Sequence, residues 1–118
     1  MPQPHTITIT GINPDGSLIL DDNGTTSTHR TDTVTWKIGP NSGVWEIVDI
    51  RDTSNLDVFN PDPRGVGNGN GRNFEGTINP NLVIPNPPNS VEESYCIDYR
   101  TSQGGTVQTH DPKIIVNG

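Results

Sequence analysis

One cysteine and one histidine near the end of the chain are the residues that could do chemistry together. Cys96 is the only cysteine, and His110 follows it within "SYCIDYRTSQGGTVQTHDPKIIVNG". A thiolate and an imidazole can bind copper, and a thiolate beside a base can act as a nucleophile. Such a cysteine needs a base or a positive charge that lowers its pKa. The neighbourhood of Cys96 is acidic, with only Arg100 expected on its face, so the sequence favours a small packed residue.

Two further sets of side chains could bind a metal. The three histidines, His5, His29 and His110, match no zinc or helix-based spacing. Calcium prefers loop oxygens, and six aspartates lie in loops rich in Asn and Gly: Asp15, Asp21, Asp22, Asp57, Asp62 and Asp111. The spacing D-x-[DN]-x-[DN]-G of a calcium-binding EF-hand loop does not occur. The sequence therefore predicts no metal and no cofactor, with loop-bound calcium as the alternative.

Motifs of the common enzyme classes are missing from the sequence. There is no G-x-S-x-G elbow for a serine nucleophile. "GVGNGNG" is rich in glycine, but no helical pattern follows it, as a phosphate-binding loop requires. The glutamates of "VEES" come just before a strand and are typical of a solvated face. We therefore expect a protein that is not an enzyme.

Binding residues are expected in one exposed aromatic residue and one long loop. Trp36 alternates with Val34 and Ile38, which places it in the core, whereas Trp45 faces the opposite way from its apolar neighbours. The stretch "NPDPRGVGNGNGRN" is longer than most loops, and such loops are often functional. The predicted contacts with a ligand or partner are Trp45, Asn68, Asn70 and Arg72.

The elements that position these residues are predicted to be strands. The 118 residues contain no alanine, twelve isoleucines against four leucines, and fourteen threonines, a composition typical of sheets. Apolar residues alternate within segments 5–12, 31–39 and 90–101. Segment 44–52 has apolar groups on both faces, which indicates a bulge or a central strand. Residues 51–73 are predicted to be mostly loop, and the prolines of 79–90 exclude an interior strand there.

About seven short strands separated by turns predict one all-β domain over residues 1–118. The expected architecture is an antiparallel two-sheet Greek-key sandwich, cupredoxin-like or Ig-like, with a small barrel as the alternative. The segment 79–90 is expected to cross between the sheets or to cover an open edge.

Two stretches carry a family resemblance. "TDTVTWKIGPNSGVW" resembles an early strand of the cupredoxin-like fold, and the C-terminal stretch that contains Cys96 resembles its closing hairpin. The family's copper site needs two histidines, a cysteine and a weak axial ligand. In this alignment Tyr99 stands where the cysteine belongs, and Val44 or Trp45 where the first histidine belongs. The resemblance therefore implies a cupredoxin-like scaffold without the copper site, in which Cys96 faces the other way and only His110 is left.

Charge and segment composition narrow the possible partners. The net charge of −7 disfavours nucleic acid and anionic membranes. No apolar run approaches the length of a membrane span, and residues 1–16 lack the pattern of a signal peptide, so we expect a cytoplasmic protein. The function predicted from the sequence is a non-catalytic sandwich for protein binding or self-association. The alternatives are a carbohydrate-binding module, with or without calcium, and a divergent cupredoxin-type copper or redox protein.

Overall fold

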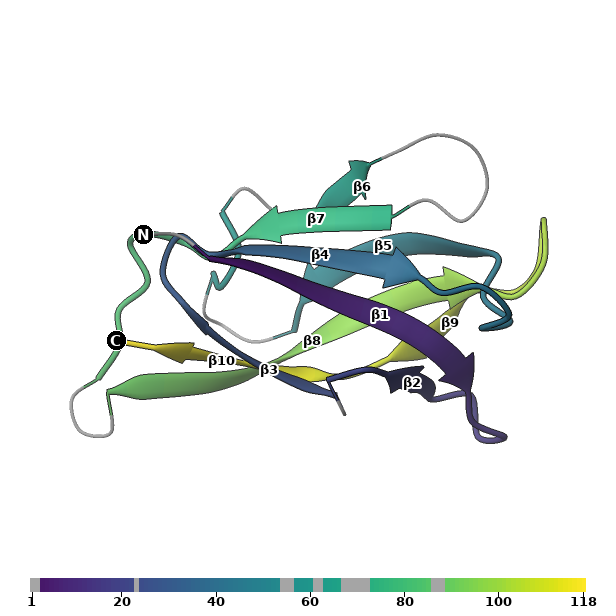
Figure 1. The fold of residues 1–118 in the computed structure, drawn as a ribbon, viewed down its shortest axis with the longest axis horizontal. Helices are drawn as coiled ribbons and strands as arrows, with labels where there is room; N and C mark the ends of the chain where they lie inside the picture. The colour runs from purple at the N-terminus through teal and green to yellow at the C-terminus, as the bar shows by residue number, and fades with distance from the viewer. Residues whose placement is uncertain (1–2, 23, 54–56, 61–62, 67–72, 86–88) are drawn as a thin grey trace.

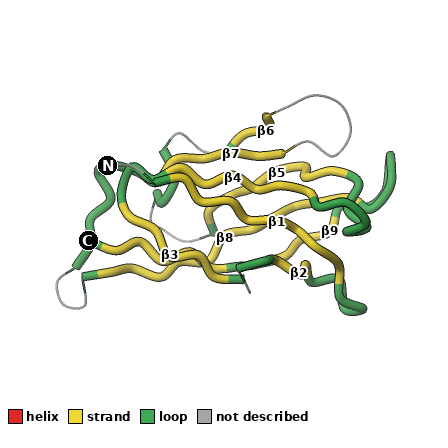
Figure 2. The backbone as a smooth tube through the Cα atoms, in the orientation of Figure 1, coloured by secondary structure: helices red, strands yellow, loops and turns green. Residues whose placement is uncertain are grey.

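The computed structural model describes residues 3–22, 24–53, 57–60, 63–66, 73–85 and 89–118. In these residues the chain forms strands and loops, with no helix (Figure 2). The strands are β1 (Pro4–Ile12), β2 (Leu18–Leu20), β3 (Thr25–His29), β4 (Thr33–Ile38), β5 (Glu46–Asp52), β6 (Arg64–Val66), β7 (Asn73–Thr77), β8 (Ser90–Arg100), β9 (Gln108–His110) and β10 (Lys113–Asn117). The prediction of an all-β fold is confirmed.

The strands form two mixed sheets. Sheet 1 has the order β2-β1-β4-β7-β6, and sheet 2 has the order β3-β10-β8-β5, with β9 also paired to β8. In Figure 1, β1 crosses in front of β8. The pairs β1/β4 and β3/β10 are parallel, so the expectation of purely antiparallel sheets is wrong for them. Parallel neighbours need a crossover connection, and here β2 and β3 lie between β1 and β4 in the chain.

A single hydrophobic cluster takes side chains from both sheets. Sheet 1 contributes Trp36 and sheet 2 contributes Tyr95, and both are fully buried. The Trp36 Nε1–H donates a hydrogen bond to the Tyr95 hydroxyl at 3.0 Å. The rings of Trp36, Phe59 and Tyr95 meet edge to face, with centroids 5.6 to 6.0 Å apart. Buried polar groups need partners, and this bond satisfies the indole N–H and joins the two sheets.

The alternation of residues fixes which face of each strand enters this cluster. Val34 and Trp36 in β4 are buried, as period-2 spacing predicts. Tyr95, Ile97 and Tyr99 in β8 belong to the core cluster, whereas Cys96 and Asp98 between them are buried outside it. The closing hairpin is formed by β8 with β9 and β10, which are separated at Asp111 and Pro112.

Strand β5 contains the predicted bulge but lies at an edge of sheet 2. Its register with β8 shifts between Ile47 and Asp49, so Val48 is the extra residue. As a result Ile47 and Ile50 both face the core, while Val48 is 36% exposed. The alternative of a central strand is therefore wrong.

Two strands were not expected from the sequence. β3, with the sequence TTSTH, has no apolar residue to mark a face, and only Thr28 is buried in it. β6 lies inside the predicted loop 51–73, so that prediction is wrong for residues 64–66. Described residues 79–85 contain no strand, and the segment connects β7 of sheet 1 with β8 of sheet 2, as predicted.

Candidate functional site

Cys96 is a buried thiol on the outward side of β8. Its Sγ donates a hydrogen bond to Asp111 Oδ1 at 2.7 Å. Burial, together with the hydrogen bond and the charge of Asp111, raises the pKa of the Cys96 thiol to about 11. Arg51, which pairs with Cys96 across the strands, opposes this effect. A thiol with this pKa is almost fully protonated at neutral pH, so this environment does not activate a nucleophile.

The positions that correspond to copper ligands hold packing residues. Tyr99 is fully buried, and its hydroxyl donates a hydrogen bond to the carbonyl of Gly16 in the β1–β2 turn. The backbone before β5 places Val44 in the core and leaves Trp45 half-buried. His110 is half-buried, and burial lowers its pKa, although the charges of nearby aspartates oppose this. These residues contribute no thiolate and a single histidine toward such a site.

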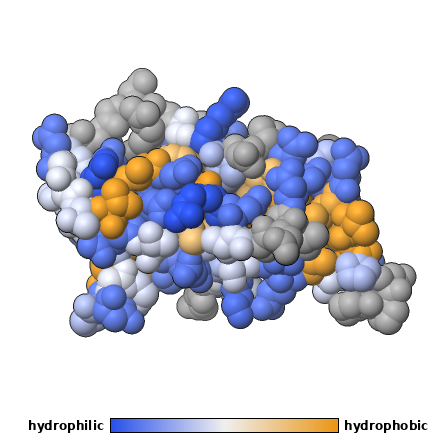
Figure 3. All heavy atoms as spheres, turned by 180° about the vertical axis from the view of Figure 1, so that it is seen from behind, coloured by the Kyte–Doolittle hydropathy of each residue, from blue (hydrophilic) through white to orange (hydrophobic). Residues whose placement is uncertain are grey.

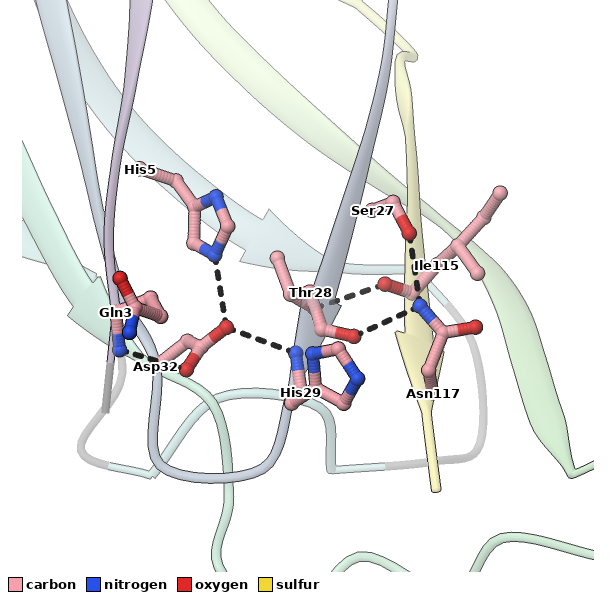
Figure 4. Close-up of polar contacts among 8 residues, drawn as sticks. All are labelled: Gln3, His5, Ser27, Thr28, His29, Asp32, Ile115 and Asn117. Atoms are coloured by element: carbon pink, nitrogen blue, oxygen red, sulfur yellow. Dashed lines mark hydrogen bonds and ion pairs between the residues drawn. The ribbon is translucent and has the colours of Figure 1, made fainter. Parts of the chain in front are cut away.

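His5 takes part in a contact that organises one end of the molecule (Figure 4). Its Nε2 lies 2.7 Å from Oδ2 of Asp32, which is only 2% exposed. Asp32 also accepts hydrogen bonds from the backbone N–H groups of Gln3 and His29, each at 2.9 Å. Burial raises the pKa of Asp32, but these three hydrogen bonds outweigh it and the net shift is downward. Asp32 therefore joins the starts of β1 and β4 to the end of β3.

The histidines do not converge on a metal. His29 has an exposed side chain, and its backbone, rather than its ring, contacts Asp32. His110 lies on β9, which pairs with β8, whereas His5 lies on β1 of sheet 1 and His29 on β3. Within the described ranges, no group of three or more His, Cys, Asp or Glu side chains is arranged to hold a metal ion.

The loop aspartates considered as calcium ligands make turn contacts. Asp15 accepts from the N–H and the hydroxyl of Ser17, and Asp21 accepts from the N–H of Thr8. Asp22 Oδ1 accepts a hydrogen bond from the Gly24 N–H at 2.7 Å. The contacts of Asp15 and Asp22 are local ones typical of aspartate in turns, whereas Asp21 reaches back to β1. Asp62 lies outside the described residues.

Almost all aromatic surface is buried. Five of the six aromatic residues belong to the core, and Trp45 is half-buried. The Trp45 N–H donates to the carbonyl of Arg100 at 2.7 Å, which fixes its backbone beside β8. The other predicted contact residues, Asn68, Asn70 and Arg72, lie outside the described residues.

A hollow lies beside β5. Its volume is about 360 Å³, and its lining consists of Asp49, Ile50, Arg51, Asp52, Asp57 and Pro63. The three aspartates give it a negative lining, and Arg51 is the basic residue among its described lining residues. The sequence did not predict this site, because Asp49 and Asp52 belong to β5 whereas Asp57 and Pro63 lie in the connection before β6.

Arg51 is exposed, and its guanidinium forms an ion pair with Asp98. Its Nε and Nη2 donate to the two oxygens of Asp98 at 2.8 and 3.1 Å, and Thr109 Oγ1 donates to the same carboxylate at 2.7 Å. The hydrogen bonds from Arg51 lower the pKa of Asp98, although burial opposes them. Since this bidentate pair neutralises the guanidinium, the carboxylates dominate the charge of the hollow.

The face seen from behind in Figure 3 is mostly hydrophilic, with hydrophobic residues gathered in patches toward its two ends. The large exposed apolar side chains of the described residues are Ile19, Val48, Val83 and Val107. Single apolar residues on a surface are ordinary, so these do not by themselves define a binding site.

Comparisons with known proteins give no family. A scan of the chain against protein-family models found no match, and a search of curated protein sequences found no significant match. The described residues also contain no helix long and apolar enough to cross a membrane.

Proposed function

We propose that this chain is a non-catalytic protein-binding module, built on a Greek-key sandwich with a cupredoxin-like arrangement and without a copper site. The scaffold is supported by the two stretches that resemble the family. The first forms β4 in sheet 1 and the second forms the β8–β9–β10 hairpin in sheet 2. The Trp36–Tyr95 hydrogen bond joins the two stretches across the core.

The observation that carries the proposal is how the reactive side chains are used. The Cys96 thiol is buried against Asp111, and the imidazole of His5 is held by Asp32. Both groups make contacts that hold the fold together, and the hollow beside β5 offers a concave surface to a partner. The hollow is concave and lined by carboxylates, and its described lining contains no nucleophile, which suits binding better than catalysis.

The chemistry of the hollow favours a basic side chain. Carboxylates of Asp49 and Asp57 form strong hydrogen bonds with ammonium or guanidinium groups. A partner would therefore insert a lysine or arginine, and the negative net charge would increase the rate of encounter with a basic surface.

An array of extended peptides tests this function. Peptides with a central Lys or Arg should bind, and the same peptides with acetyl-lysine or citrulline should bind at least about tenfold more weakly, since only the charge has been removed. Binding should weaken as salt is raised. Asp49→Asn/Asp57→Asn should lose the preference, whereas Asp15→Asn, which changes a distant turn, should keep it. Equal binding of charged and neutral peptides would count against the proposal.

The carbohydrate-binding alternative depends on Trp45, the only aromatic side chain outside the core. A glycan array with the native chain and with Trp45→Ala, each with and without a chelator, tests it. Binding that is lost in Trp45→Ala would support this function over the protein-binding one.

A further inference from the structure

The outer strands of both sheets are closed to further pairing by different means. Sheet 1 ends in β2 and β6, which have three residues each. Sheet 2 ends in β3 and β5, which have five and seven residues. An open edge is a template for pairing with another chain, and short edge strands reduce that hazard. The longer strands β3 and β5 need another form of protection.

Strand β3 is capped at both ends. Thr25 N–H donates to the carbonyl of Asp22 at 3.3 Å, and His29 N–H donates to Asp32 Oδ2 at 2.9 Å. The carbonyl of His29 accepts from Asp32 N–H at 3.2 Å. In a parallel ladder alternate residues face the paired strand, so these capped groups point to the free side together with those of Ser27. The free side is therefore reduced to the middle of the strand.

Strand β5 is protected by a bulge and one carboxylate. Val48 is the extra residue in the register with β8, and a bulge increases the local twist of an edge. Directly after it, Ile50 N–H donates to Asp49 Oδ1 at 2.9 Å. An N–H that is bonded to its neighbour's side chain is not available to an incoming strand.

We propose that Asp49 and the bulge at Val48 protect sheet 2 from strand addition, and that their loss turns β5 into an interface with a second copy of this chain. At seven residues, β5 is longer than the other outer strands of the described residues, β2, β3, β6 and β9. The β5 strands of two copies can pair antiparallel to each other about a two-fold axis, which is the commonest symmetry of homodimers. Pairing in a register centred on Ile50 would place residue 49 of one copy opposite Arg51 of the other. This inference does not depend on the proposed peptide-binding function.

Three variants distinguish the hydrogen bond that Asp49 accepts from the negative charge that it carries. Asp49→Ala removes the acceptor, whereas Asp49→Asn removes the same charge and keeps an oxygen for the Ile50 N–H. Deletion of Val48 together with Asp49→Ala also removes the bulge. It leaves Ile47 opposite Tyr99 and residue 49 opposite Asp98, so the inward residues keep their faces.

Sedimentation velocity over a range of protein concentrations measures association. Asp49→Ala should reach half-association at a protein concentration at least about tenfold below that of the native chain. The variant that combines this substitution with deletion of Val48 should do so at a lower concentration again. Asp49→Asn should behave like the native chain. Hydrogen exchange gives a second readout: the Ile50 amide should exchange faster in dilute Asp49→Ala and become protected again as the variant associates.

Two results would overturn the proposal. One is association of Asp49→Asn equal to that of Asp49→Ala, which would make charge the cause instead of the cap. The other is Asp49→Ala that associates no more strongly than the native chain. If the deletion variant fails to fold, the two substitutions still decide, because the Asp49 side chain is exposed and lies outside the core.

Discussion

Asp32 should be among the most sensitive single positions outside the hydrophobic core. Its carboxylate receives the N–H groups of Gln3 and His29 and the ring nitrogen of His5. In Asp32→Ala these donors lose their acceptor. A buried donor left without a partner costs about 1 to 3 kcal/mol, and water can reach the half-exposed His5 and the exposed Gln3, so values near the lower limit apply. The three contacts together give a loss of about 3 kcal/mol in the free energy of unfolding.

Urea denaturation followed by tryptophan fluorescence measures this loss directly. Buried Trp36 reports on the core, and the midpoint should fall without a change in slope. In a thermal scan the same loss should lower the melting temperature by about 12 °C for a domain of this size. Asp15→Ala is the matched control, because Asp15 caps Ser17 within an exposed turn, and it should change stability much less.

The pH dependence gives an independent test of the same position. Because the pKa of folded Asp32 lies below its ordinary value of 3.8, its stabilisation is present above that value. It is lost as the pH falls through the lowered folded pKa. The difference between the native chain and Asp32→Ala should therefore be largest near neutral pH and shrink below about pH 4. A loss under about 1 kcal/mol, or one unchanged in acid, would refute this role of the carboxylate.

Three further outcomes follow from contacts in the core and on sheet 2. Tyr95→Phe removes the acceptor of the Trp36 indole N–H and should cost about 1 to 3 kcal/mol in urea denaturation, and an unchanged midpoint would contradict the bond. Iodoacetamide at pH 8 should alkylate native Cys96 at least about tenfold more slowly than the urea-unfolded chain, because little thiolate is present in the folded state. A rate equal to that of the unfolded chain would exclude a raised pKa. Arg51→Met should destabilise by about 1 kcal/mol in urea denaturation, because the buried Asp98 loses its cation. Arg51→Lys should restore only part of this, since lysine cannot form the bidentate pair.

Local patterns predicted the parts of the fold in which one face is apolar. The alternation around Trp36 and around Tyr99 gave the correct buried faces, because period 2 is a property of the strand itself. The mixed apolar pattern of 44–52 likewise indicated the bulge found in β5. In each case the signal lies within a few neighbouring residues.

Features that depend on distant residues were not predictable in this way. β3 is polar, and it is held by side-chain and backbone contacts to β10, such as Thr28 Oγ1 to the carbonyl of Ile115 at 2.8 Å. The parallel pairs depend on how the chain crosses between sheets, which no local pattern encodes. No local pattern marks Asp32, because its carboxylate is satisfied by three donors, of which Gln3 lies just before β1 and His5 lies in it. The hollow beside β5 likewise combines β5 with the connection before β6.

The position of β10 between β3 and β8 has a consequence for how the chain reaches this structure. Thr28 and Ile115, which are bonded across β3 and β10, are 87 positions apart in the sequence. Contacts of such separation form slowly, because a long loop must close before they stabilise anything. During synthesis from the N-terminus, β3 and β8 are made before the strand that joins them. Until β10 is made, the edges of β3 and β8 that pair with it stay unpaired. The nascent chain should depend on chaperones during this interval and be most prone to misassembly then.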